Sequence, residues 1–225
     1  MMADSVFCSL GPLVLGTHNR KKCLELAELL APLGWPLATL ADFPQAITVA
    51  ETGDTFAANA ALKATVQARQ LGAWVLGEDS GISVDALDGR PGVYSARYAG
   101  ASATDEANNA LLLTELAGMS PERRTAHYTC HVVLSDPTGQ IIARQEAYCR
   151  GRIRTGPAGR GGFGYDPLFE ILEYHRTFGE LGGAVKSVLS HRARAVRQLV
   201  EVTGSRDIRE KLALASHGEG STLRR

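Results

Sequence analysis

The pattern of apolar and polar residues alternates along the chain. Short apolar runs, typical of strands, are followed by segments in which apolar residues recur every three or four positions, as on one face of a helix. Residues 13–16 are an apolar run, and a polar turn, Thr17-His18-Asn19, follows. Leucines then recur at 26, 29, 30 and 33, which is the i, i+3, i+4, i+7 spacing of an amphipathic helix. Asn19 is a suitable N-cap, and Gly34 ends the pattern. This segment predicts a strand, a turn and a helix.

The same alternation continues along the chain. A second strand is predicted at 37–40, a buried strand at 73–77 and an apolar stretch at 82–87, with a hairpin formed by 127–134 and 140–149. Helices are predicted from the turn at 52–55 to about residue 71, from residue 104 or 105 to 116, and from about 190 to 202. Ser80-Gly81, after Glu78 and Asp79 at the strand end, is expected to be a turn, and the glycine-rich residues 156–164 a loop. Alternating strands and helices predict an α/β fold.

The domain organisation is predicted to be simple. No internal repeat and no long linker divides the chain, so residues 1–205 are expected to form a single domain. Residues 206–225 begin helix-like and end in a segment rich in glycine and serine, which predicts a frayed, partly disordered C-terminal extension.

Composition narrows the class of protein. The 225 residues carry 24 basic and 24 acidic side chains, so an extended nucleic-acid-binding face or a polybasic membrane surface is disfavoured. No apolar stretch approaches the 18 or so residues of a membrane span, and the first residues lack a secretory signal pattern. The four cysteines form no CxxC pair. We therefore expect a cytoplasmic protein with free thiols and no nucleic acid or membrane partner.

Three carboxylates lie at predicted element ends. Glu78 and Asp79 follow a buried strand, and Glu51 precedes a helix. Ligands of open α/β sheets bind beyond the carboxyl ends of strands, and Mg²⁺ prefers a few carboxylate oxygens together with water and phosphate. A magnesium site is one interpretation, and solvated loop acids are the other.

Basic groups near these acids suit a phosphate. Lysine is rare in this chain, and Lys63 lies four residues after Asn59 on one helix face. The turn of Thr17, His18, Asn19, Arg20, Lys21 and Lys22 leads into a helix N-terminus, whose backbone N–H groups favour an anion. A solvated lysine and an exposed basic turn are the alternatives.

A glycine-rich segment combines aromatic side chains with a carboxylate. Phe163 or Tyr165, beside Gly164, can stack on a base, and Asp166 can orient a donor; a tight turn with a buried aromatic is the alternative. Lys186, His191 and Arg192 offer further donors around a predicted helix N-terminus.

Taken together, these segments resemble the inosine/xanthosine triphosphate pyrophosphatase family. The resemblance rests on five motifs in register, namely GTHNRKK (16–22), ETGDTFAANAALKA (51–64), EDSGISVDALDGRPGVYSARYAG (78–100), GGFGYDPLF (161–169) and KSVLSHRARA (186–195). It implies hydrolysis of ITP, dITP or XTP to the nucleoside monophosphate and pyrophosphate, with Mg²⁺ as cofactor. It also implies an elongated two-lobed α/β protein with a long central mixed sheet flanked by helices and a nucleotide cleft between the lobes, commonly a homodimer.

The resemblance also implies residue roles. Asp79 matches the proton acceptor that activates water, and Glu51, Glu78 and Asp79 match the metal cluster. Thr17 to Lys22 with Lys63 match the triphosphate-binding groups. The remaining nucleotide contacts are Ser80, Phe163, Gly164, Tyr165, Asp166, Lys186, His191 and Arg192. Two alternatives stay open: a Maf-like pyrophosphatase for other modified nucleotides, and an inactive relative that binds a nucleotide or RNA.

Overall fold

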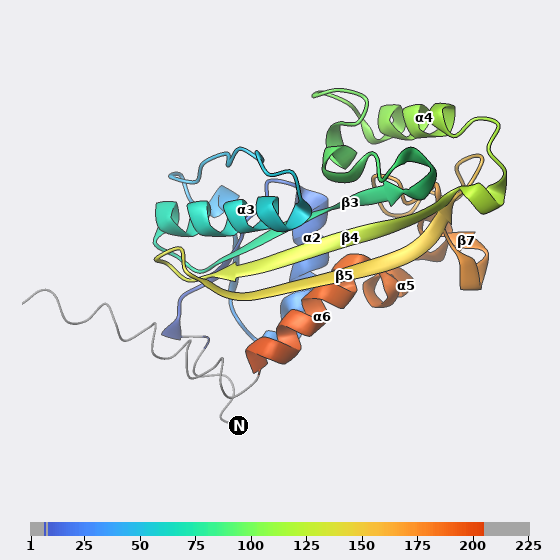
Figure 1. The fold of residues 1–225 in the computed structure, drawn as a ribbon. Coiled ribbons are helices and arrows are strands. Elements are labelled where there is room, and N and C mark those ends of the chain that lie inside the picture. Colours follow the sequence, from blue (N-terminus) through green and yellow to red (C-terminus); the bar gives the residue numbers. More distant parts are fainter. Residues whose placement is uncertain (1–6, 8, 205–225) are drawn as a thin grey trace, which may run out of the picture. The chain divides into compact units, whose positions relative to one another are not determined.

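The computed structural model describes Phe7 and residues 9–204, so the predicted C-terminal extension lies outside the described residues. Across these residues, seven strands form one mixed sheet in the order β2-β1-β3-β4-β5-β6-β7 (Figure 1). The strands are β1 (Leu13–Leu15), β2 (Leu37–Thr39), β3 (Val75–Val84), β4 (Thr125–Ser135), β5 (Ile141–Ile153), β6 (Phe169–Ile171) and β7 (Arg176–Thr177). The longer helices are α2 (Arg20–Leu30), α3 (Phe56–Leu71), α4 (Asp105–Glu115), α5 (Phe178–Leu189) and α6 (His191–Gly204). The predicted α/β class is confirmed.

The chain folds into two compact units. Of the described residues, the first unit comprises those up to Asp79, residues 131–145 and residues 195–204, and the second comprises residues 80–130 and 146–194. The long strands β3, β4 and β5 each contribute residues to both units. The single domain predicted for residues 1–205 stays a prediction, as do the elongated shape and the cleft.

The first unit begins with the predicted strand, turn and helix. β1 pairs in parallel with both β2 and β3, so α2 is the crossover between β1 and β2. Asn19 caps α2, because its side-chain oxygen accepts the Lys22 N–H at 3.1 Å. The helix stops at Leu30, and a 3₁₀ turn ends at Gly34 in the left-handed region. These predictions are confirmed.

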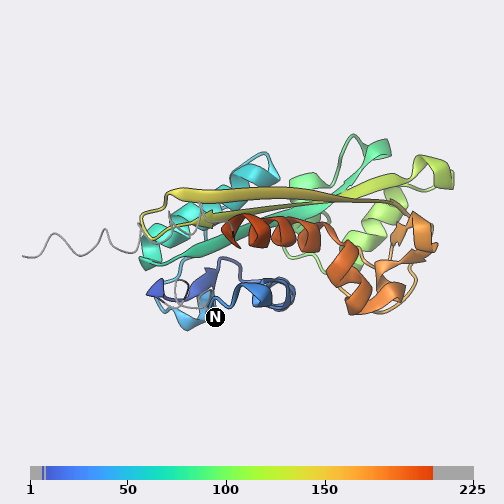
Figure 2. The same cartoon turned by 90° about the horizontal axis from the view of Figure 1, so that it is seen from below.

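Helix α3 packs closely on β3. Its buried face carries Ala60, Ala64 and Ala68, and a Cβ atom at Gly77 would lie 2.2 Å from the Ala60 carbonyl oxygen. Only glycine therefore permits this approach between the helix and the strand. In the first unit, α3 covers one face of the sheet and α6 the other, with Ala195, Val196 and Leu199 buried (Figures 1 and 2).

The turn predicted at Ser80-Gly81 is wrong. β3 runs without interruption from Val75 to Val84, and every residue in it is buried except Ser80, which is half-buried. Packing on both faces of the sheet keeps these residues in the strand, although Ser and Gly are typical of turns. Glu78 is consequently a fully buried strand residue and not a solvated loop acid.

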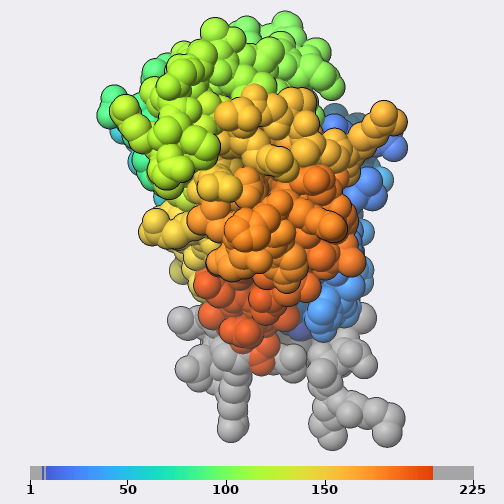
Figure 3. All heavy atoms as spheres, turned by 90° about the vertical axis from the view of Figure 1, so that its right-hand side faces the viewer, coloured from blue at the N-terminus to red at the C-terminus, as the bar shows by residue number. Residues whose placement is uncertain are grey.

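The second unit has its own hydrophobic core, which contains Tyr128, Phe169 and Phe178 together with apolar side chains of β3, α4 and β5. The α4 segment lies beside the glycine-rich segment near residue 160, as the space-filling view of this unit shows (Figure 3). Two hydrogen bonds join these segments: the Gly164 N–H donates to Asp105 at 2.9 Å, and Asn109 donates to the Gly164 carbonyl at 3.0 Å.

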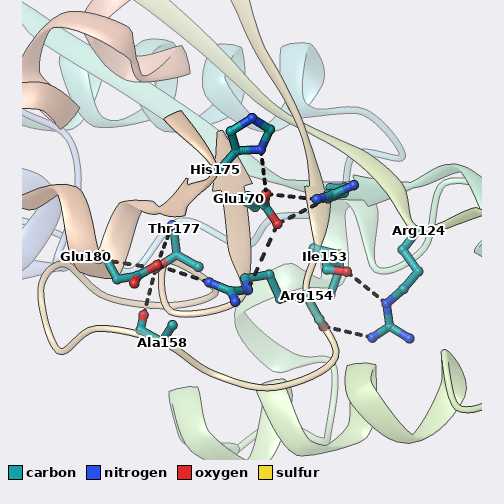
Figure 4. Close-up of polar contacts among 9 residues, drawn as sticks. Arg124, Ile153, Arg154, Ala158, Glu170, His175, Thr177 and Glu180 are labelled. Atoms are coloured by element: carbon teal, nitrogen blue, oxygen red, sulfur yellow. Dashed lines mark hydrogen bonds and ion pairs between the residues drawn. The ribbon is translucent and has the colours of Figure 1, made fainter. Parts of the chain in front are cut away.

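Helix α5 and the strands β6 and β7 are elements that the hydrophobic pattern does not predict. A capping box opens α5, since the Thr177 side chain accepts the Glu180 N–H and the Glu180 side chain accepts the Thr177 N–H. The Thr177 hydroxyl also donates to the Ala158 carbonyl at 2.7 Å, as Figure 4 shows. Nearby, the buried guanidinium of Arg124 donates to the Ile153 and Arg154 carbonyl oxygens. These bonds fix β5 and the start of α5.

No helix within Phe7 and residues 9–204 is both long enough and apolar enough to cross a bilayer.

Candidate active site

A cluster of carboxylates and lysines lies in the first unit. The Lys63 Nζ atom lies 2.8 Å from Asp79 Oδ1 and 2.9 Å from Glu51 Oε1, so it joins α3, β3 and the segment before α3. Lys22, from the first turns of α2, places its Nζ atom 2.8 Å from Glu78 Oε2. The predicted acids Glu51, Glu78 and Asp79 are thus brought together with two of the predicted phosphate-binding lysines.

Burial sets the electrostatics of this cluster. Burial raises the pKa of Asp79 above its ordinary value, although Lys63 and Lys22 act in the opposite direction. For Lys63, burial favours the neutral amine, but Asp79, Glu78 and Glu51 outweigh it, so its pKa is raised and the ammonium form persists. The Asp79 Oδ2 atom is buried without a hydrogen-bond partner. Asp79 is therefore a buried carboxylate with one oxygen held and one available as an acceptor.

The carboxylate oxygens of this cluster are the type of ligand that a hard cation prefers. Within the described residues, no three His, Cys, Asp or Glu side chains gather as a metal site; Glu51 and Asp79 pair with Lys63, and Glu78 pairs with Lys22. Carboxylate oxygens, together with the unpartnered Asp79 Oδ2, are the ligands that a divalent cation such as Mg²⁺ prefers.

The predicted phosphate turn lies at the N-terminus of α2. His18, Asn19, Arg20 and Lys21 are exposed, whereas Thr17 and Lys22 are half-buried. The Asn19 N–H donates to the Thr17 hydroxyl at 3.2 Å, which shapes the turn. Positive side chains at a helix N-terminus favour an anion. Lys22 links this turn to Glu78, so the predicted phosphate turn and acid cluster meet in one unit.

A second cluster, in the second unit, is centred on Asp166. Its Oδ2 atom accepts the Phe163 N–H at 2.8 Å and lies 2.6 Å from Lys186 Nζ, with both charged side chains buried. The Lys186 Nζ atom also lies 4.3 Å from the centroid of the Phe163 ring. Arg192 donates to the Ser80 hydroxyl at 2.9 Å, and its guanidinium carbon lies 5.7 Å from the same centroid. Asp166, Lys186, Arg192 and Ser80, all predicted site residues, therefore form one connected cluster with Phe163.

The two aromatic candidates differ in environment. Tyr165 is 4% exposed within the hydrophobic core, and its hydroxyl donates to the Ser95 carbonyl at 2.8 Å. Phe163 is half-buried. Of the two rings, Phe163 is therefore the one placed for stacking on a ligand, whereas Tyr165 anchors the loop.

One residue in this cluster was not found from the sequence. Tyr128, on β4, stacks on the His191 imidazole with ring centroids 4.5 Å apart and an interplanar angle of 6°. The alternation along residues 127–134 predicts a strand, but nothing in that pattern distinguishes Tyr128 from its neighbours as a site residue. Its role follows from the packing of β4 against the start of α6.

Comparison with known proteins shows the family. The model of the Ham1 family matches residues 13–202. The chain belongs to the Ham1 family. The matched range contains both of the clusters described above and every predicted site residue.

Two curated relatives and one solved structure illustrate the similarity to Ham1 proteins. The dITP/XTP pyrophosphatase of Rhodopirellula baltica is 56% identical over 188 residues, which is 84% of this chain and 90% of the relative. The dITP/XTP pyrophosphatase of Exiguobacterium sp. is 49% identical over 83% of this chain and 94% of the relative. A HAM1 protein from Coxiella burnetii superposes with a TM-score of 0.78 at 35% identity, covering 85% of this chain and 98% of that one.

Proposed function

We propose that the chain hydrolyses noncanonical purine nucleoside triphosphates, ITP, dITP and XTP, to the nucleoside monophosphate and pyrophosphate. The names of the two curated relatives described above support this substrate class. The observation that carries the proposal is the buried Asp79 carboxylate, with one oxygen held by Lys63 and the other without a partner. An acceptor in that position can hold the water molecule that attacks the anhydride bond between the α and β phosphates.

The first cluster provides the phosphate chemistry in this proposal. Asp79 accepts the proton of the attacking water, and its raised pKa makes it a stronger base than an ordinary carboxylate. Lys63 fixes the orientation of Asp79 and, with Lys22 and the turn at the start of α2, offsets the charge of the triphosphate.

We propose Mg²⁺ as the cofactor, held by Glu51, Glu78 and Asp79. A triphosphate that approaches this cluster is repelled by the carboxylates, and a bound cation would reduce that repulsion. When bound, Mg²⁺ withdraws electron density from the phosphate oxygens and neutralises their charge.

The second cluster provides base recognition in this proposal. Phe163 stacks on the purine, and His191 and Arg192 supply donors for a 6-oxo group. Adenine presents an amino donor at the same position, so a site built from donors leaves it mispaired. Asp166 and Lys186 hold the Phe163 loop by their ion pair and by the Asp166 bond to the Phe163 N–H. On the basis of the resemblance we also propose a cytoplasmic homodimer, and sedimentation of the purified chain checks the dimeric state.

Asp79→Asn tests the catalytic assignment. The amide keeps the size of the side chain but is not a base, so kcat for ITP is expected to fall roughly 10²- to 10⁴-fold while ITP binding persists. The measurements are pyrophosphate release and calorimetric ITP binding. Asp85→Asn is the matched control, because the Asp85 side chain is 60% exposed and bonded to Thr125 and not to the cluster. An Asp79→Asn rate equal to that of the control removes Asp79 from the proposed role.

A further inference from the structure

Tyr128 lies in the second unit, where its ring contacts the imidazole of His191. The two rings are nearly parallel, at 6° with 4.5 Å between centroids, and both residues are buried, with 7% and 4% exposure. A flat stack of this kind restricts rotation of the imidazole about its χ2 torsion, because any tilt pushes one ring edge into the other. The Tyr128 ring therefore sets the plane of His191.

The Tyr128 ring is itself held in place. The Phe169 ring packs against it with centroids 4.6 Å apart and planes 56° to each other, and Phe178 lies further away at 6.5 Å. The hydroxyl of Tyr128 lies 3.4 Å from Asp166 Oδ1. Burial raises the pKa of Tyr128 well above its ordinary value, so the hydroxyl keeps its proton and donates to Asp166. One side chain thus contacts both His191 and the centre of the Phe163 cluster.

The backbone of His191 is fixed independently of this stack. His191 is the first residue of α6, and the Ser190 hydroxyl accepts the Ala193 N–H at 3.1 Å as a cap. The helix start therefore fixes where the side chain leaves the backbone, and the stack fixes its rotation. With its backbone position and its ring rotation both fixed, the imidazole presents its N–H donor in one direction. A donor fixed in this way discriminates between an oxo and an amino group.

We propose that Tyr128 is a positioning residue for purine selectivity, acting through the plane of the His191 imidazole. The inference rests on the proposed function, since it assigns His191 to the 6-oxo group. The contacts of Tyr128 described above are all with residues of the second unit. Its loss is expected to affect which purine is used and not the phosphate chemistry.

Three variants test the inference. Tyr128→Met fills most of the volume without a flat ring, Tyr128→Phe keeps the ring and loses the hydroxyl, and Phe178→Leu removes a buried aromatic of the same core, whose ring centroid lies 6.5 Å from that of Tyr128. Tyr128→Leu repeats the first substitution if the methionine variant gives little folded protein. The measurements are kcat and KM for ITP and ATP, with thermal unfolding for each variant.

The ratio of kcat/KM for ITP to that for ATP is the decisive quantity. We expect Tyr128→Met to lower this ratio roughly threefold to tenfold through a higher KM for ITP, and Tyr128→Phe to restore it to within about twofold of the unsubstituted protein. Phe178→Leu should lower the unfolding temperature and leave the ratio unchanged. A ratio unchanged in Tyr128→Met, or equal losses on ITP and ATP, overturns the inference.

A binding measurement separates failure of this inference from failure of the proposed function. Calorimetric titration with ITP uses the Asp79→Asn background, in which turnover does not consume the ligand. Weaker ITP binding in Tyr128→Met and not in Tyr128→Phe supports the positioning role, whether or not the parent chain turns ITP over. Equal ITP affinity in both variants overturns it.

Discussion

A buried lysine contributes positive charge to each of the two clusters. Lys63 and Lys186 are 8% and 6% exposed, and burial of an ammonium group is costly unless carboxylates compensate for it. Lys63 is paired with Glu51 and Asp79, and Lys186 with Asp166. These ion pairs hold the site residues in place, so their loss is expected to reduce stability as well as activity.

The pair of Lys186 and Asp166 yields a prediction on stability. Lys186→Met leaves the Asp166 carboxylate buried beside an apolar group, so the free energy of unfolding is expected to fall by roughly 3–5 kcal/mol. Adding Asp166→Asn removes that uncompensated charge, and the double variant should lose less than the sum of the single ones. Urea unfolding measures all three. Arg90→Met, in an ion pair whose arginine is 55% exposed, is the control and should cost much less. Strictly additive losses contradict the coupling.

At the scale of elements, the helices with clear start signals could be predicted from the sequence. Asn19, Thr55 and Thr104 each cap a helix at the expected position. Helix α5 was missed because Gly182 and Gly183 break its apolar pattern, and Gly182 is non-helical, with φ of 74°. The Thr177–Glu180 capping box was the signal that could have revealed α5.

The candidate site could be predicted in composition but not in pairing. Motif spacing identified Glu78, Asp79 and Lys63, because their order along the chain matches a family pattern. Which carboxylate meets which lysine depends on how α2 and α3 pack against β3, and local sequence does not specify that packing. For the same reason, Tyr128 and its stack on His191 emerged only from the three-dimensional structure.

The contact between α3 and β3 yields a prediction at this scale. Gly77→Ala places a Cβ atom 2.2 Å from the Ala60 carbonyl oxygen and 2.6 Å from the Ala64 nitrogen, so α3 must shift. We expect a loss of roughly 1–3 kcal/mol in stability and a lower kcat for ITP, because α3 carries Lys63. Urea unfolding and pyrophosphate release measure the two effects. Gly156→Ala is the matched control, since nothing lies within 4 Å of its added Cβ atom. Equal stability of the two variants contradicts the close packing.

At the scale of the whole molecule, each unit contributes one type of chemistry. The first unit carries the acids and lysines proposed for the triphosphate, and the second carries the aromatic and basic groups proposed for the purine. Along β3, Asp79 belongs to the first unit and the next residue, Ser80, to the second. We therefore propose that residues of the first unit carry out turnover and that residues of the second unit determine purine selectivity.

The decisive experiment for Mg²⁺-dependent hydrolysis of noncanonical purine nucleotides is a pyrophosphate-release assay. It uses ITP, XTP, dITP, GTP and ATP at mildly alkaline pH, with Mg²⁺ and separately with EDTA. We expect rapid pyrophosphate release from ITP, XTP and dITP with Mg²⁺, little from GTP and ATP, and almost none with EDTA. Binding of ITP without release from any of the five, or release confined to modified pyrimidine nucleotides in an extended panel, would contradict it.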